Sequence, residues 1–298
     1  MKTEVPTIET VSAMTNPSLG RVVWSPLKSC WYSGMTLIAL VGVPLTISWP
    51  AFLLFLALSA ITLCLGHSLG MHRRLIHRSY DCPKWLEYLL VYLGTLVGMA
   101  GPIGMIRTHD TRDWAQRQNT CHDFFAHRQT FWRDAWWQLH CEIHLENPPR
   151  FVLPDDLARD RFYLALEKTW MLQQLLWALV LGWLGGISWV VWGIAVRVTV
   201  SLTGHWLVGH FAHRQGQRTY HVNDACVQGY NVRWSGLITF GECWHNNHHA
   251  YPGSAKLGLH RHQIDPGWGV LCALRAIGLA WNIKLPRDIP ERKQLRLI

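Results

Sequence analysis

The chain has 298 residues, of which 49% are hydrophobic and only 16% are charged. This composition excludes an intrinsically disordered chain and is poor in charge for a water-soluble one. The formal net charge of +9 suits nucleic acid, anionic ligands or an anionic membrane surface. The 18 tryptophans and 17 histidines are more specific, because Trp favours membrane–water interfaces and His favours metal binding and proton transfer.

Two long apolar blocks predict membrane-spanning helices. Residues 29–71 contain no Lys, Arg, Asp or Glu, which leaves room for two passes of about 20 residues through a hydrocarbon layer about 30 Å thick. We expect spans at residues 31–48 and from 51 to about 66. Residues 169–213 form the second block, in which glycines near position 185 favour a turn between two more spans. The alternative, a buried helical core, fits charge-free runs of this length less well.

The sequence therefore predicts an all-α membrane protein with four transmembrane helices in two hairpins, interfacial helices and a His-rich cytoplasmic cap. The basic residues avoid the two hairpin turns, so the positive-inside tendency places both termini and the cap in the cytoplasm. The apolar stretch 88–106 is expected to be an interfacial or re-entrant helix, because a third crossing would separate the histidines on its two sides. We expect an N-terminal cytoplasmic segment at 1–30, a membrane domain at 31–285 and a polar tail at 286–298.

Other classes of site have little support. The eight cysteines are scattered without a Cys-x-x-Cys pair, so neither a disulfide framework nor a thiolate zinc site is predicted. Nucleotide-binding loops are also absent from the sequence. Basic residues interleaved with Trp flank the apolar spans, so we expect anionic lipid headgroups as their partners and no nucleic acid.

Three clusters of histidines predict a metal site. Their members are His67, His72 and His77; His109, His122 and His127; and His245, His248 and His249. Helical neighbours three or four residues apart can converge on one ion, and the more widely spaced His72 and His77 can do so if the end of their helix is rewound. Imidazole with little thiolate favours non-haem iron over copper or catalytic zinc. Surface histidines that only titrate are the alternative.

Two of these clusters lie in motifs of a known family. GMHRRLIHRSY at residues 70–80 and FGECWHNNHHAYPGSA at residues 240–255 resemble the first and third histidine boxes of the membrane fatty acid desaturases, in particular the delta-9 acyl-CoA or acyl-lipid branch. The resemblance extends over residues 31–285. It implies two iron ions that activate O2 with electrons from a carrier protein and remove two vicinal hydrogens from a long acyl chain, leaving a cis double bond. The implied metal ligands are His72, His77, His109, His213, His245, His248 and His249.

The second box departs from the family pattern. Where the family has His-Arg-x-His-His, this chain has His109-Asp-Thr-Arg112-Asp113. A guanidinium cannot ligate a metal, whereas the Asp113 carboxylate can, so we include Asp113 in the candidate ligand set. A surface pair between Arg112 and Asp113 is the alternative. Gly209 stands where the family usually has Asn, four residues before His213. These changes are compatible with a rearranged site for two irons, a site for one metal, or a different oxidation.

We therefore expect an O2-dependent desaturase of a long-chain fatty acyl group, with no catalytic residue beyond the metal ligands. The expected substrate is a fatty acyl-CoA or an acyl-lipid in the bilayer, and the expected electron donor is a separate ferredoxin or b-type cytochrome. A related hydroxylase, another lipid oxygenase and a non-catalytic lipid- or metal-binding homologue are the alternatives. We expect Trp114, Trp132, Trp136 and Trp137 in an interfacial belt rather than an acyl tunnel wall, and His140 and His144 on one face of an interfacial helix.

Overall fold

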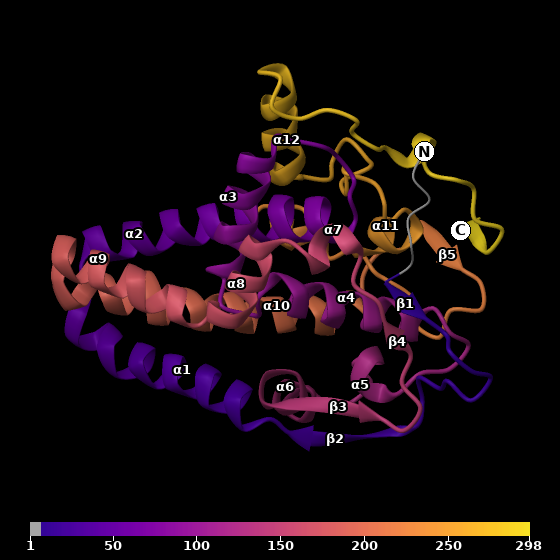
Figure 1. Ribbon diagram of the computed structural model, residues 1–298, viewed down its shortest axis with the longest axis horizontal. Helices are drawn as coiled ribbons and strands as arrows, with labels where there is room; N and C mark the ends of the chain where they lie inside the picture. The colour runs from indigo at the N-terminus through magenta and orange to yellow at the C-terminus, as the bar shows by residue number, and fades with distance from the viewer. Residues whose placement is uncertain (1–6) are drawn as a thin grey trace.

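The computed structural model describes residues 7–298, so the first six residues of the predicted N-terminal segment lie outside the described residues. The described chain is predominantly helical, and its strands form only two-stranded sheets. Three continuous helical stretches are long and apolar enough to cross a membrane: Pro26–Thr46, Trp49–Ile76 and Leu172–Ala212. They run next to one another and extend together from the rest of the molecule (Figure 1).

The first two stretches contain helix α1 (Pro26–Thr46), helix α2 (Trp49–Ala60) and the π-helix η1 (Ile61–Ile76). Ser48 separates α1 from α2 and caps α2 by accepting a hydrogen bond from the Ala51 amide. The 21 residues of α1 correspond to about 31 Å, the thickness of a hydrocarbon layer. Both helices begin a few residues before the predicted spans, and the second continues about ten residues beyond its predicted end.

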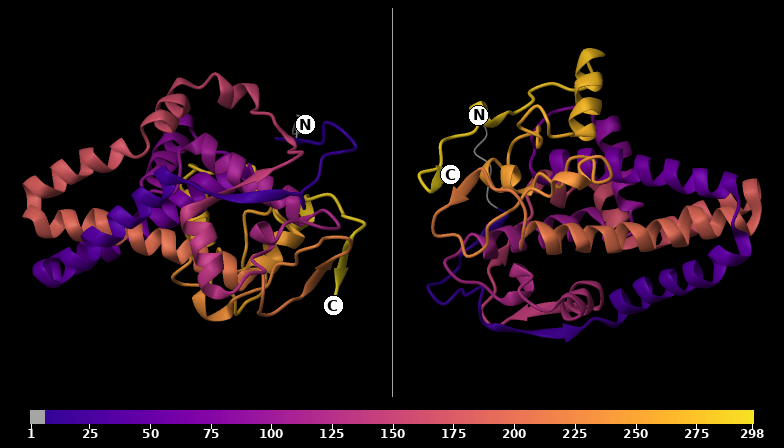
Figure 2. Two further views of the ribbon diagram at one scale, coloured as in Figure 1. Left: turned by 90° about the horizontal axis from the view of Figure 1, so that it is seen from below. Right: turned by 180° about the vertical axis from the view of Figure 1, so that it is seen from behind.

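The third stretch combines α9 (Leu172–Val190), η2 (Val191–Val196) and α10 (Arg197–Ala212). Its 41 residues are not one straight helix, because Gly186 has φ 66° and ψ −163° and lies outside the helical region. A glycine adopts this conformation without the steric cost that a Cβ atom would bring. The backbone reverses there, so that α9 runs away from the bulk of the protein and α10 returns to it (Figures 1 and 2).

The surface of these helices is apolar. Leu45 is 78% exposed, Leu179 is 74% exposed and Trp183 is 85% exposed. Exposed apolar area of this extent is unfavourable in water and favourable in lipid. The one charged side chain of the third stretch, Arg197, is buried and donates hydrogen bonds to Gln174 and to backbone carbonyls. The protein is therefore membrane-associated.

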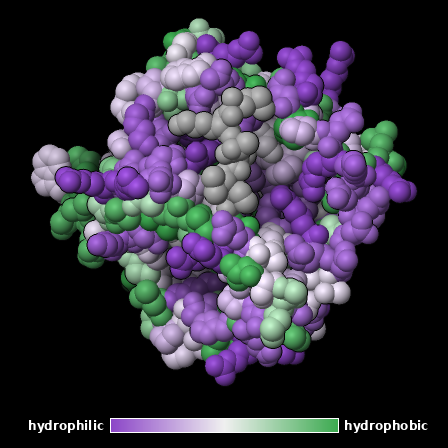
Figure 3. Space-filling view, turned by 45° about the vertical axis from the view of Figure 1, so that its right-hand side comes forward, coloured by the Kyte–Doolittle hydropathy of each residue, from purple (hydrophilic) through white to green (hydrophobic). Residues whose placement is uncertain are grey.

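The remaining helices gather at one end of the long stretches (Figure 1). They are α3 (Lys84–Thr95), α4 (Pro102–Gln116), α5 (Asp123–Ala126), α6 (Phe131–His140), α7 (Asp155–Ala158), α8 (Arg161–Thr169), α11 (His245–Ala250) and α12 (Pro266–Ala276), with the 3-10 turns η3 (Arg233–Ser235) and η4 (Pro286–Asp288). Hydrophilic side chains predominate on the face seen from this end (Figure 3). The stretch 88–106 is not a single helix, because α3 ends at Thr95 and α4 begins at Pro102.

Three antiparallel strand pairs tie distant segments together. They are β1 (Ile8–Glu9) with β4 (Arg150–Phe151), β2 (Gly20–Trp24) with β3 (Cys141–Leu145), and β5 (Tyr220–Val222) with β6 (Leu295–Leu297). Helix α6 ends at His140 and His144 lies in β3, so the prediction of one interfacial helix carrying both histidines is wrong. The pairing of Cys141 with Trp24 draws this segment into a strand. Trp132 and Trp136 are exposed on α6, whereas Trp114 and Trp137 pack against a buried cluster around α5.

Helix α3 packs unusually closely on η1. A Cβ atom added to Gly66 would lie 2.3 Å from the Gly94 nitrogen, and one added to Gly70 would lie 2.4 Å from the Leu90 oxygen. Small residues four apart allow two helix backbones to approach in this way. The contact fixes the end of η1, which carries two of the candidate ligands.

Candidate metal centre

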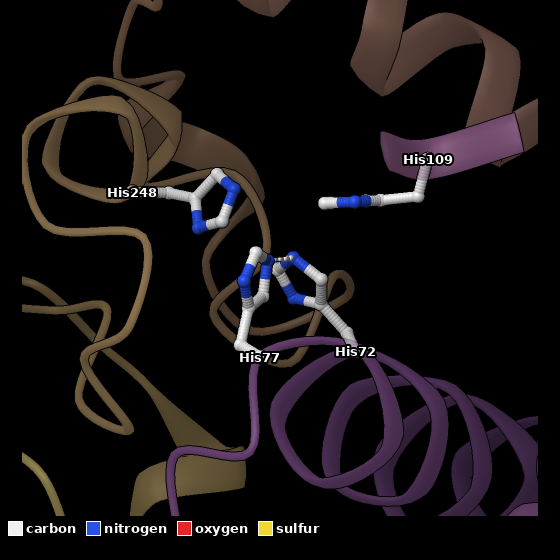
Figure 4. Close-up of side chains that lie close together, drawn as sticks. All are labelled: His72, His77, His109 and His248. Atoms are coloured by element: carbon white, nitrogen blue, oxygen red, sulfur yellow. Dashed lines mark hydrogen bonds between the residues drawn. The ribbon is translucent and has the colours of Figure 1, made fainter. Parts of the chain in front are cut away.

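Four of the predicted ligands converge on one space, and we call them the first histidine group. His72 and His77 come from the end of η1, His109 comes from α4 and His248 from α11. Their imidazole rings face one another (Figure 4). One ligand nitrogen from each ring lies within 4.8 Å of the others, and the Nε2 atoms of His72 and His77 are 3.1 Å apart. Four imidazole nitrogens at this spacing can surround one metal ion.

The π-helical winding of η1 brings His72 and His77 to the same face. The His77 amide donates to the His72 carbonyl oxygen over 3.0 Å, so the backbone closes a hydrogen bond across five residues. An ordinary α-helix has 3.6 residues per turn and would rotate positions five apart away from each other. The end of this helix is therefore rewound, as the five-residue spacing of His72 and His77 predicted.

Carboxylates hold the outer nitrogens of two rings in this group. His72 Nδ1 lies 2.7 Å from Glu242 Oε2, and His109 Nδ1 lies 2.9 Å from Asp110 Oδ1. Ser68 donates to the other oxygen of Glu242. A proton on Nδ1 facing a carboxylate leaves the Nε2 lone pair free, which is the usual arrangement behind a metal-binding imidazole.

Three other predicted ligands form the second histidine group: His213 at the end of α10, with His245 and His249 from α11. The Nε2 atoms of His213 and His245 are 3.0 Å apart, and those of His245 and His249 are 3.1 Å apart. His213 Nδ1 donates to the Gly209 carbonyl oxygen over 2.7 Å, so its Nε2 carries the lone pair. The chain thus offers two adjacent clusters of nitrogen donors.

Burial keeps most of these imidazoles neutral. It lowers the pKa well below the ordinary value for His77, His213, His245 and His248, and lowers the pKa of His249 to about 4. At His109 burial also acts to lower the pKa, but Asp113 and Asp110 outweigh it and raise the pKa. Neutral imidazole is the form that binds a metal. Convergent lone pairs backed by carboxylates fit first-row transition metals.

Comparison with known proteins agrees with the sequence motifs and this geometry. The fatty acid desaturase pattern matches residues 47–271. An sn-1 stearoyl-lipid 9-desaturase of Anabaena variabilis is 37% identical over 279 residues, which is 93% of this chain and 98% of the relative. An acyl-CoA 5-desaturase of Anemone leveillei is 35% identical over 251 residues, 84% of this chain and 77% of the relative. The chain belongs to the fatty acid desaturase family.

Family membership confirms the resemblance read from the two histidine boxes. The chain is a desaturase, an oxidoreductase of lipid metabolism with a lipid substrate and a membrane context. A delta-9 acyl-lipid desaturase of Arabidopsis thaliana is a further relative, 35% identical over 252 residues, which is 84% of this chain and 80% of that protein. These relatives differ in the acyl carrier and in the double-bond position that their names state, so similarity alone does not choose between them.

In the second box of this desaturase, Arg112 and Asp113 have separate partners. Asp113 pairs with Arg117 over 2.7 Å, and Arg112 turns to the other side, where it donates to His127 Nε2 and, over 2.7 Å, to Gln138. The alternative of an Arg112–Asp113 pair is therefore wrong. Burial acts to raise the pKa of Asp113, but His109 and Arg117 outweigh it, so the pKa is lowered and the carboxylate stays ionised. Asp113 belongs to neither histidine group.

Sequence reasoning missed the carboxylates behind the imidazoles. Asp134 lies 2.9 Å from His127 Nδ1 and 2.8 Å from His210 Nδ1, and it accepts a hydrogen bond from Trp206. The sequence marks Asp134 only as the one acidic residue among the aromatic residues of α6. Glu242 and Asp110 had a stronger signal, because Glu242 lies three residues before His245 and Asp110 adjoins His109. An acidic residue close in sequence to a predicted histidine ligand therefore indicates a carboxylate that can orient the imidazole.

Proposed function

We propose that this desaturase introduces a cis double bond, in a delta-9-like position, into a long-chain fatty acyl group in an O2-dependent reaction. The observation that carries the proposal is the pair of convergent histidine groups beside apolar helices in a chain of this family. The first histidine group would hold one iron and the second would hold the other, with Asp113 as a further candidate ligand. Two irons with O2 would supply the oxidising power that an unactivated C–H bond requires and that acid–base side chains lack.

The chain's own residues prepare these sites. Glu242 and Asp110 orient His72 and His109 so that their Nε2 lone pairs point to the centre of the first histidine group. The Gly209 carbonyl oxygen does the same for His213. Burial of the imidazoles excludes bulk water, which protects a reactive centre from side reactions.

We further propose four membrane spans in two hairpins, with residues 31–285 as the membrane domain and both termini and the metal site in the cytoplasm. The reversal at Gly186 supports this arrangement because it divides the 41-residue stretch into an outgoing and a returning helix. Trp49 and Trp183 are exposed near the two turns, where an aromatic belt would meet the far interface. The two turns contain no basic residue, which supports the orientation by the positive-inside tendency.

The substrate would be an acyl-CoA or an acyl-lipid, and electrons would come from a separate ferredoxin or b-type cytochrome. Relatives named for both acyl carriers support this range. The formal charge of +9 favours an acidic electron carrier on the hydrophilic face.

The test is product analysis with purified protein in lipid vesicles, supplied with iron, ferredoxin, its reductase and either stearoyl-CoA or a stearoyl glycerolipid. We expect O2 consumption and a monounsaturated product whose double-bond position is set by mass spectrometry. A hydroxylated product would show an oxygenase instead. Bound iron without O2 consumption or product would favour a non-catalytic role. His248→Ala is the inactive reference, because it removes one nitrogen of the first histidine group.

A further inference from the structure

The two histidine groups differ in the charges that surround them. The first histidine group has four imidazoles, and the carboxylates of Glu242 and Asp110 lie against two of them at 2.7 and 2.9 Å. The second histidine group has three imidazoles, and within the described residues no carboxylate oxygen lies within 4.0 Å of their nitrogens. The outer nitrogen of His213 faces a backbone carbonyl oxygen instead. A neutral carbonyl stabilises a bound cation less than a carboxylate does.

Charged side chains of both signs lie near the second histidine group. Arg292 donates to the backbone oxygen of His249 over 2.9 Å, and Arg117 and Asp113 also interact electrostatically with the His249 ring. Arg117 is neutralised by Asp113 at 2.7 Å. The Arg292 contact places a positive charge next to the second histidine group, which has three imidazoles rather than four.

Arg112 adds a further positive charge through His127. The His127 ring lies parallel to the His213 ring, with 5.3 Å between centroids and 6° between planes. Arg112 donates to His127 Nε2, and Asp134 holds the opposite nitrogen at 2.9 Å. A Cβ atom on Gly209 would lie 3.2 Å from His127 Nε2, so the glycine leaves room for this stack. The guanidinium is thus fixed one ring away from His213.

We propose that the two histidine groups are unequal metal sites and that Arg112 is the positioning residue that makes them so. The second histidine group is the weaker site, which loads last and releases its ion first. The first histidine group contacts the carboxylates of Glu242 and Asp110 directly, whereas the second contacts none and has Arg292 beside His249 and Arg112 one ring away from His213. The Coulomb repulsion between a guanidinium and a divalent ion supplies the difference. This inference rests on the proposed function, because it takes both groups as iron sites.

The test measures iron retention. Detergent-solubilised protein loaded with iron-57 is dialysed against increasing chelator, and iron per chain is followed by elemental analysis and Mössbauer spectroscopy. We expect the wild type to fall from two irons to one at low chelator and to none at much higher chelator. Arg112→Gln keeps a donor for His127 and removes the charge, and should move the first step to about tenfold higher chelator. Asp110→Asn should instead move the second step to lower chelator.

Two variants separate charge from structural damage. Arg112→Lys retains the charge and should release iron as the wild type does, and Arg107→Gln removes an exposed cation from the same helix and should change neither step. Two irons released in one step would overturn the inference and leave the proposed function intact. The inference would also be overturned if Arg112→Gln released iron at the same chelator concentrations as the wild type. It would likewise be overturned if Arg112→Lys released iron as Arg112→Gln does. A wild type that binds no iron would overturn both proposals.

Discussion

The close contact between η1 and α3 makes Gly70→Ala a sensitive probe of the metal centre. Gly70 lies two residues before His72, and a Cβ atom there would lie 2.4 Å from the Leu90 oxygen and 2.5 Å from the Leu90 carbonyl carbon. Ordinary van der Waals contact requires roughly 3.5 Å, so the two backbones must separate by about 1 Å. Both atoms belong to the backbone of α3, which cannot move aside as a side chain can.

Overpacking of this kind costs about 1–3 kcal/mol, against a gain of up to about 1 kcal/mol for replacing a helical glycine by alanine. We therefore expect a net loss of about 1–2 kcal/mol in the free energy of unfolding. A displacement of about 1 Å at the end of η1 also moves His72 and His77 relative to His109 and His248. Iron content should fall together with stability, because coordination bonds tolerate little of this displacement.

The assay compares thermal unfolding in detergent and iron per chain for Gly70→Ala and for a matched control. Gly34→Ala is that control, because nothing lies within 4 Å of a Cβ atom added to Gly34 in α1. It should retain iron and be as stable as the wild type or slightly more stable. Equal stability and equal iron in the two variants would show that η1 and α3 are not in this close contact.

Three further predictions concern the histidines and the cysteines. His72→Ala should abolish desaturation and lower bound iron while the protein stays in the membrane. Replacement of the exposed His262 by alanine should change neither desaturation nor bound iron. Full activity of His72→Ala would contradict the assigned site. Burial lowers the pKa of His127 from 6.5 to about 4, so the unfolded state binds the proton first as the pH falls. In the iron-free protein, protonation of His127 alone should therefore remove about 3 kcal/mol of stability between pH 6.5 and pH 4, and the other buried imidazoles add to this loss; thermal unfolding measures it, and a flat profile would refute this. The sulfur atoms of Cys121 and Cys226 lie 2.7 Å apart, so copper phenanthroline with O2 should cross-link them and block maleimide labelling of both; continued labelling would place the two loops apart.

The membrane environment, the candidate histidine ligands and one helix turn could be predicted from apolar runs, histidine motifs and glycine positions in the sequence. Residues 29–71 lack charge, which predicts a membrane environment, and the family motifs named seven histidines that the fold brings into two groups. Local signals also placed the turn near Gly186, because a backbone of that conformation favours glycine. These features depend on composition and short-range geometry, which the sequence contains directly.

Other features required contacts between distant segments. The division of the histidines into a group of four and a group of three depends on how α4, α10 and α11 pack, and no spacing along the chain specifies it. The alternative of an Arg112–Asp113 pair failed for the same reason, since neighbours on a helix point about 100° apart and meet different elements. The segment after His140 became a strand because β2 pairs with it. Sequence thus determined the membrane environment and the kind of ligand, whereas tertiary packing decided which charges surround each group, because electrostatic interactions depend on distance in space rather than along the chain.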